Sequence, residues 1–223
     1  MKAMILAAGR GERMRPLTDI TPKPLLEVGG KRLIEYHLDS LAKAGVRDVV
    51  INLSWLGDQI RKVLGEGSRH GLSIHYVDEG PVALETGGGI FNALPLLGDA
   101  PFLVLSADIW TDYPLAGCAT KLAPGDTAHF VLVPNPDFHT RGDFGLEGSR
   151  VIDHSERHTY ANIGLFRPEF FANCQPGRFP LSPLMFEWIR RGRVSGELYP
   201  GRWHNVGTPK QLEQLHSSLT LEA

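Results

Sequence analysis

The chain has 223 residues, of which 42% are hydrophobic and 22% are charged, a composition that is ordinary for a folded globular protein. Its formal charge of −2 argues against a dedicated nucleic-acid binder. The two cysteines, Cys118 and Cys174, show no metal-ligand spacing and suit a reducing cytoplasm. No apolar run approaches the roughly 18 residues of a membrane span. We therefore expect one domain over 1–223, in the cytoplasm, with no nucleic acid or membrane partner.

The first element is an apolar strand at 4–8 that runs into a glycine-rich basic loop. Gly9 and Gly11 allow a ligand to approach the backbone closely because they carry no Cβ. Arg13 and Lys23 bring positive charge to the same loop. Successive N–H groups together with two cations favour a polyphosphate ligand.

The glycine pattern does not fit two common phosphate-binding motifs. A dinucleotide fingerprint needs a third glycine at position 14, which is Met14. A P-loop ends in Gly-Lys-Ser/Thr, whereas Gly30-Lys31 is followed by Arg32. Residues 6–18 and 22–34 instead resemble the signature LAAGxGxRxxPLT and PKPLLxVxGKPLI of the sugar-1-phosphate nucleotidylyltransferases, with Arg32 where proline is usual.

This resemblance implies an enzyme that joins a nucleoside triphosphate to a sugar 1-phosphate, releases pyrophosphate and uses Mg²⁺. It implies that Lys23 holds the two reacting phosphates together and that Arg13 draws charge onto the leaving pyrophosphate. The nucleotide-binding residues implied in this stretch are Leu6, Ala7, Ala8, Gly9, Gly11, Arg13 and Lys23.

Strand and helix patterns alternate after the loop. We expect strands at 47–52, 72–77, 101–106 and 128–133, and helices at 33–44, 56–65, 87–97 and 113–122. This alternation predicts a mostly parallel mixed sheet covered on both faces, a Rossmann-like three-layer α/β/α fold. Ligands bind such sheets beyond the carboxyl ends of the strands, so the loops at 9–22, 79–86 and 107–112 should line one cleft.

The pattern changes after residue 135. Segments 143–146 and 150–153 flank Glu147-Gly148-Ser149 and predict a hairpin. A strand at 160–166, a helix near 182–191, a strand near 194–199 and a helix near 208–219 follow. We interpret 1–135 as the nucleotide-binding part and 136–223 as the sugar-binding part. Family members often carry a C-terminal β-helix or a dimerisation extension, and the chain ends too soon for either, which favours a monomer.

Two residues are candidate metal ligands. Asp108 follows the strand at 101–106 and offers a hard oxygen ligand suited to Mg²⁺. Strand-end aspartates more often cap helices or face solvent, but the resemblance implies the family's catalytic metal aspartate here. The family's second metal carboxylate lies in a W-x-D-x-G-T segment, where this chain has Asn205. An amide oxygen can bind Mg²⁺ without adding charge; the alternative is that Asn205 only caps the final helix.

Residues 84–90, LETGGGI, occupy the place of the family's base-reading turn. Glycines are costly at a helix start, which is explained if a flat base lies against the backbone. The nucleotide contacts expected here are Thr86, Gly87 and Gly88. This form of the turn looks like that of N-acetylmuramate 1-phosphate uridylyltransferases of bacterial peptidoglycan recycling, which implies UTP and N-acetylmuramic acid 1-phosphate as substrates.

Other substrates stay open at this point. Relatives acting on mannose or heptose 1-phosphates have similar turns, and glucose or N-acetylglucosamine 1-phosphate, or another nucleotide, would also fit the family. A sugar-nucleotide sensor without turnover is the alternative outside enzymes, and Asn205 is the feature that favours it.

Sugar contacts are implied by two later segments. Residues 156–158, Glu-Arg-His, stand where relatives have Glu-Lys-Pro, and 160–166 matches their N-x-G-x-Y/F strand. A guanidinium at 157 binds anions bidentately and suits the lactyl carboxylate of a muramic acid, although a surface ion pair explains it equally well. The substrate-binding residues implied are Asp108, Gly145, Glu156, Arg157, Asn162 and Trp203.

Overall fold

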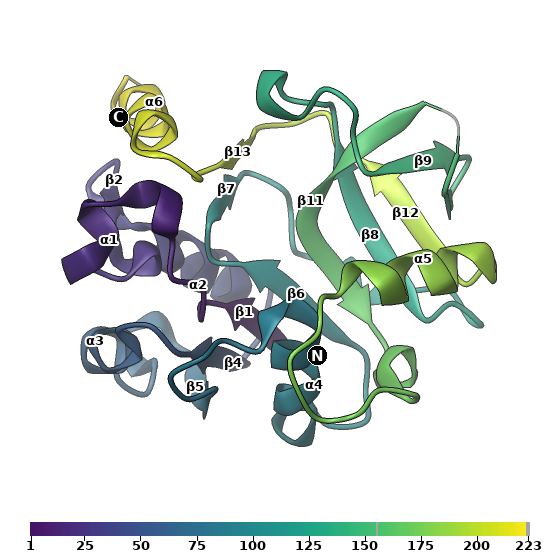
Figure 1. Cartoon of the computed structure of the whole chain (residues 1–223), viewed down its shortest axis with the longest axis horizontal. Helices are drawn as coiled ribbons and strands as arrows, with labels where there is room; N and C mark the ends of the chain where they lie inside the picture. Colours follow the sequence, from purple (N-terminus) through teal and green to yellow (C-terminus); the bar gives the residue numbers. More distant parts are fainter. Residues whose placement is uncertain (155, 222–223) are drawn as a thin grey trace.

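The computed structural model describes residues 1–154 and 156–221 and is built around a nine-stranded mixed sheet with helices on both faces (Figure 1). Across the sheet the strands follow in the order β5 (Ser73–Asp78), β4 (Asp48–Leu53), β1 (Ala3–Leu6), β6 (Phe102–Ser106), β11 (Arg157–Phe166), β8 (Ala128–Val133), β12 (Val194–Leu198), β10 (Arg150–Ile152) and β9 (Phe144–Glu147). One half is parallel and contains β1, β4, β5 and β6. β1, β4 and β6 are apolar and largely buried because both faces of the sheet are covered there, whereas the edge strand β5 is only partly buried. The expected three-layer α/β/α fold is confirmed.

The other half is mainly antiparallel. It contains β8, β9, β10, β11 and β12. β11 lies antiparallel between β6 and β8, and only β8 and β12 pair in parallel. The sheet thus continues across residue 135, and the division into a nucleotide and a sugar part stays a prediction.

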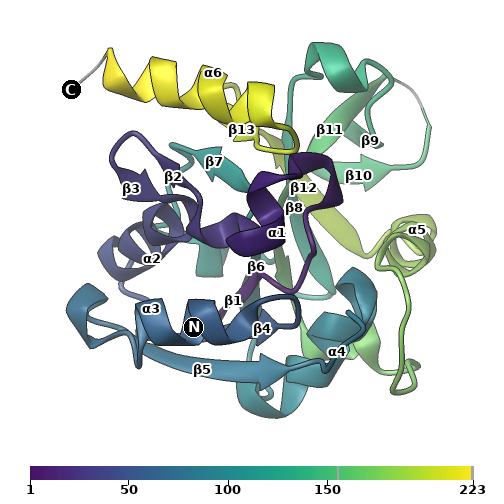
Figure 2. The same ribbon diagram turned by 60° about the vertical axis from the view of Figure 1, so that its left-hand side comes forward.

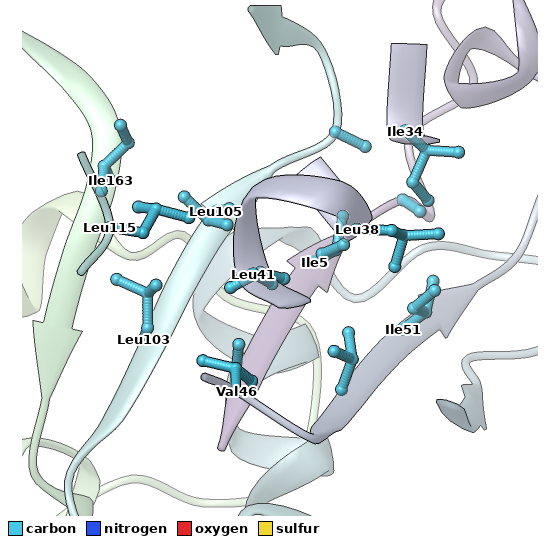
Figure 3. Close-up of a cluster of buried hydrophobic side chains, with 14 of the residues drawn as sticks. Ile5, Ile34, Leu38, Leu41, Val46, Ile51, Leu103, Leu105, Leu115 and Ile163 are labelled. Atoms are coloured by element: carbon cyan, nitrogen blue, oxygen red, sulfur yellow. The ribbon is translucent and has the colours of Figure 1, made fainter. Parts of the chain in front are cut away.

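Helices cover the sheet on both sides. α2 (Leu33–Lys43) and α3 (Gly57–Leu64) pack on one face, and α4 (Glu85–Leu97) and α5 (Ser182–Arg190) pack on the other. Successive side chains of β1 alternate between the two cores: Ile5 belongs to the α2 side, and Met4 to the α4 side. Figure 3 shows Leu38 and Leu41 of α2 facing the strands.

A third, smaller core joins the two ends of the chain. α6 (Pro209–Thr220) lies beside the two-stranded sheet of β2 (Glu27–Val28) and β3 (Lys31–Arg32) (Figure 2). Leu215 of α6 packs with Met14, Val28 and Val206. The short α1 (Leu17–Ile20) lies in the N-terminal loop. This core therefore holds the segment before α6 beside the glycine-rich loop.

One expected element is wrong. Residues 113–122 form no α-helix but an irregular segment with a single 3-10 turn, Cys118–Thr120. Pro114 and the left-handed Gly117 (φ 79°) break the helix, and the buried Tyr113, Leu115 and Cys118 pack on the sheet instead. The other expected elements are present with ends shifted by a few residues. The antiparallel pair of β7 (Ile109–Thr111) and β13 (Trp203–Asn205) was not predicted from the sequence.

Within the described residues, no helix is both long and apolar enough to cross a bilayer.

Candidate active site

A cleft of about 570 Å³ opens where the parallel strands end, as the topology predicts. We call it the strand-end cleft. Each of the four parallel strands contributes to its wall at its carboxyl end: Leu6, Ala7 and Ala8 at the end of β1 and just after it, Asn52 in β4, Glu79 after β5, and Ser106, Ala107 and Asp108 at the end of β6 and just after it. Gly9, Gly11, Arg13 and Lys23 from the N-terminal loop complete it.

The two loop glycines have different roles. Gly11 is left-handed (φ 68°), and a Cβ there would lie 3.1 Å from Cγ2 of Thr18. The Thr18 hydroxyl donates a hydrogen bond to the Gly11 carbonyl at 2.8 Å. Gly11 is thus required by the fold of the loop itself. A Cβ on Gly9 would meet no protein atom within 4 Å. The packing of the protein therefore does not require glycine at this position, whereas the close approach of a ligand to the backbone would.

Lys23 and Asp108 meet at the wall of this cleft. Lys23 Nζ lies 2.8 Å from Asp108 Oδ2, and the Ser106 hydroxyl donates to Asp108 Oδ1 at 2.6 Å. Burial alone would raise the pKa of Asp108, but the charge and hydrogen bond of Lys23, with the Ser106 hydroxyl, hold it below its ordinary value. Asp108 is therefore an ionised carboxylate at neutral pH.

Asn205 lies beside Asp108 and has an unused oxygen. Its partner in the β7–β13 pair is Ile109, and the Val206 amide donates to the Asp108 carbonyl at 2.8 Å. The Oδ1 atom of Asn205 is buried, and no described residue donates a hydrogen bond to it. The idea that Asn205 caps α6 is wrong, because Thr208 is the cap and accepts from the Gln211 amide at 3.3 Å.

These two residues fit a magnesium ion that takes most of its ligands from phosphates and water. An unsatisfied buried oxygen costs about 1–3 kcal/mol, which a cation would recover. The described residues contain no cluster of three or more His, Cys, Asp or Glu side chains suited to a metal. Mg²⁺ in phosphate-transfer sites needs only one or two protein ligands, so the small set is sufficient.

Arg13 stands between the strand-end cleft and a second cleft. It lines both, as does Thr86. Its guanidinium lies close to Gly207, where an added Cβ would be 3.4 Å from Nη2. No ion pair or hydrogen bond joins its side chain to any described residue. Arg13 therefore offers an uncompensated positive charge to a ligand that spans the two clefts.

Gly87 and Gly88 do not line either cleft. A Cβ on Gly88 would lie 2.3 Å from the Gly177 carbonyl oxygen, and one on Gly87 would lie 2.6 Å from the Phe179 ring. The Gly88 amide also donates to the Phe179 carbonyl at 3.0 Å. These glycines thus allow segment 177–179 to pack on the start of α4, and their contact with a nucleotide stays a prediction.

A series of polar contacts in the wall of the strand-end cleft was not predicted from the sequence. The Ala7 amide donates to Asn52 Oδ1 at 2.8 Å, and Asn52 Nδ2 donates to Glu79 Oε1 at 2.6 Å. The other Glu79 oxygen accepts from the Leu84 amide at 2.7 Å. These hydrogen bonds connect the start of the glycine-rich loop to the turn before α4. The signal was available, because Asn52 interrupts an apolar strand near its carboxyl end.

The second cleft, of about 500 Å³, lies beside β11, and we call it the β11 cleft. Asn162 lines it from a left-handed position (φ 58°) at a bulge, where the β11–β8 register shifts between Tyr160 and Gly164. Trp203 also lines it and donates from Nε1 to the Ala161 carbonyl at 2.9 Å. Asn205 also lines this cleft.

Three expected sugar-binding residues lie outside the β11 cleft. Gly145 is buried between strands, where a Cβ would meet the His154 carbonyl oxygen at 2.2 Å. Glu156 is exposed and lines none of the cavities described. Arg157 donates from Nη2 to the Asp153 carbonyl at 2.9 Å and lies 3.6 Å from its carboxylate. The surface-pair interpretation of Arg157 thus has a partner, Asp153.

Comparison with known proteins decides the family. Residues 2–221 match the family model described as nucleotidyl transferase. The chain belongs to the nucleotidyl transferase family. The family expected from residues 6–34 is thereby confirmed.

Two curated relatives of this nucleotidyl transferase carry the same name, N-acetylmuramate alpha-1-phosphate uridylyltransferase. The protein from Neisseria meningitidis serogroup B is 47% identical, with 96% of each chain covered. The one from Caulobacter vibrioides is 36% identical, with 93% of this chain and 92% of the relative covered. A Bacillus anthracis structure, described as a candidate glucose-1-phosphate thymidylyltransferase in complex with sucrose, shares the fold with a TM-score of 0.89 at 20% identity, covering 99% of this chain and 95% of its own.

Proposed function

We propose that this nucleotidyl transferase transfers UMP from UTP to N-acetylmuramic acid 1-phosphate, forming UDP-N-acetylmuramic acid and pyrophosphate. The names of the two relatives support the substrates. The observation that carries the reaction is that the Lys23–Asp108 pair lies beside Asn205, whose buried side-chain oxygen has no hydrogen-bond donor, where the strand-end cleft and the β11 cleft approach each other.

The chemistry is an in-line displacement. An oxygen of the sugar phosphate attacks the α-phosphorus of UTP, one phosphorus–oxygen bond forms, and the bond to pyrophosphate breaks. The attacking phosphate is ionised at neutral pH, so no general base is needed. Catalysis then consists of positioning and charge neutralisation. Lys23 binds the two reacting phosphates, and Arg13 stabilises the charge that develops on pyrophosphate.

Asp108 and Asn205 are the residues that would hold Mg²⁺. When bound, the ion would neutralise phosphate charge during transfer. Asp108 supplies the negative ligand, and Asn205 supplies a neutral oxygen. The carboxylate of Asp108 is ionised without the ion because Lys23 compensates its charge.

The remaining assignments follow from these substrates. The nucleotide occupies the strand-end cleft with contacts from residues 6–11 and from Thr86, Gly87 and Gly88. The sugar occupies the β11 cleft beside Asn162 and Trp203. Gly145 and Glu156 do not line this cleft in the structure, so a contact between them and the sugar would require the cleft to change shape. We place the enzyme in the cytoplasm, where UTP is made, as a monomer in peptidoglycan recycling.

Pyrophosphate release with a matrix of nucleotides and sugar 1-phosphates tests the proposal. UTP with N-acetylmuramic acid 1-phosphate should give the highest kcat/KM, and chelation of Mg²⁺ should stop turnover. Faster turnover of mannose 1-phosphate with GTP would show that the proposed substrates are wrong, although the family assignment would still hold. Tight binding of UTP without pyrophosphate release would identify a sensor.

A further inference from the structure

A third cavity, of about 480 Å³, adjoins the β11 cleft and is used by none of the steps above. We call it the Phe138 pocket. The two cavities share Phe138 and His139, which lie on the 3-10 turn Asp137–His139. Phe138 is 56% exposed, unusual for a phenylalanine, and stands at the boundary of both. The Phe138 pocket is lined by Phe138, His139, Thr140, Arg141, Gly142 and Arg157.

The charge of this pocket is strongly one-sided. Two arginines, Arg141 and Arg157, are among its six lining residues, and no aspartate or glutamate is. The nearby Asp143 forms no ion pair with either arginine: its oxygens instead contact His139 Nε2 at 3.0 Å and accept from the Tyr160 amide at 2.8 Å. The pocket therefore favours an anion.

The two arginines are not equivalent. Arg157 already donates to the Asp153 carbonyl and lies 3.6 Å from the Asp153 carboxylate, so part of its capacity is taken. Arg141 has no hydrogen bond or ion pair with any residue of 1–154 or 156–221. Its planar fork is free to bind a carboxylate bidentately.

We propose that the Phe138 pocket is a subsite for an acidic substituent of the sugar, with Arg141 as the main ligand of its carboxylate. This inference rests on the proposed function, since N-acetylmuramic acid differs from N-acetylglucosamine by a lactyl ether that carries a carboxylate. The sugar ring occupies the β11 cleft, and the substituent passes Phe138 into the adjoining pocket. Phe138 covers the apolar part of the lactyl group, and Arg157 is a weaker second cation.

The test compares three sugar 1-phosphates with saturating UTP: N-acetylmuramic acid 1-phosphate, the methyl ester of its lactyl carboxylate, and N-acetylglucosamine 1-phosphate. Wild type should prefer the acid over the two compounds that lack the lactyl carboxylate charge. In Arg141→Ala, the ratio of kcat/KM for the acid to that for the ester should fall by about 10- to 150-fold, the worth of a charge-assisted bond. Arg141→Lys should restore part of the ratio, and Arg157→Ala should lower it less.

Arg191→Ala is the matched control, because Arg191 is an exposed arginine of the α5 end paired with Glu187 at 2.6 Å and lines none of the three cavities. It should leave the ratio at the wild-type value. Failure of wild type to use the acid with UTP would overturn the proposed function and the subsite together. A wild-type preference for the acid that persists in Arg141→Ala, or equal losses on all three compounds, would overturn the subsite and leave the function standing.

Discussion

The strand-end cleft and the β11 cleft are built on different principles. In the first, four parallel strands end at one edge of the sheet, and each delivers its next residues to the same place. In the second, the wall depends on a bulge at Asn162, on the turn before β9 and on β13. Parallel topology therefore fixes the nucleotide side almost automatically, whereas the sugar side depends on local irregularities that a few substitutions could move.

The largest effect on both clefts is expected from removal of the Asp108 carboxylate, which lies where they approach each other. We expect Asp108→Ala to lower kcat by about 10²–10³-fold, since loss of one contact to the reacting phosphates costs roughly 3–4 kcal/mol of barrier. Pyrophosphate release measures the loss, and thermal unfolding checks that the fold is intact. Asp58→Ala, an exposed aspartate of α3, is the control. Near-normal Mg²⁺-dependent activity in Asp108→Ala would remove Asp108 from the metal site.

Lys23→Ala tests the same junction from the cationic side. The charge of Lys23 is needed most where the two phosphates meet, so kcat should fall by about 10²-fold, more than KM for UTP rises. Steady-state kinetics with both substrates varied separates the two constants. A rise in KM with kcat preserved would make Lys23 a simple binding residue.

The same contrast explains what the sequence could predict. Residues 7–11 and Asp108 follow strands of the parallel half of the sheet, so their convergence was predictable from motif and topology. Gly145 and Arg157 lie in an antiparallel region, where the register and the 2.9 Å bond to the Asp153 carbonyl decide which way a side chain faces. The pattern of apolar and polar residues in this part of the sequence does not determine that register. Asn52 and Glu79 were missed because their role is to bind other protein groups.

A pair of glycine substitutions separates glycines needed for the fold from those needed for a ligand. Gly88→Ala places a Cβ against the Gly177 carbonyl and should destabilise the protein by about 1–3 kcal/mol in urea unfolding. Gly9→Ala meets no protein atom, so stability should stay within about 0.5 kcal/mol. Its methyl group instead enters the strand-end cleft, and KM for UTP should rise. A normal KM in Gly9→Ala would show that no phosphate approaches that backbone.

The smallest expected effect concerns Asn205, which lies between the two regions. Asn205→Asp should tighten Mg²⁺ binding by about 10-fold, because a carboxylate adds Coulomb attraction that even in a well-solvated site is worth about 1 kcal/mol or more. The substitution is nearly isosteric, and its buried oxygen has no protein donor to lose. The Mg²⁺ concentration that gives half-maximal activity measures the change, and the Mg²⁺-induced shift in melting temperature without nucleotide reports it independently of catalysis. An unchanged titration by both measurements would place residue 205 outside the metal site, and the unsatisfied oxygen would then have to be filled by water or by the sugar.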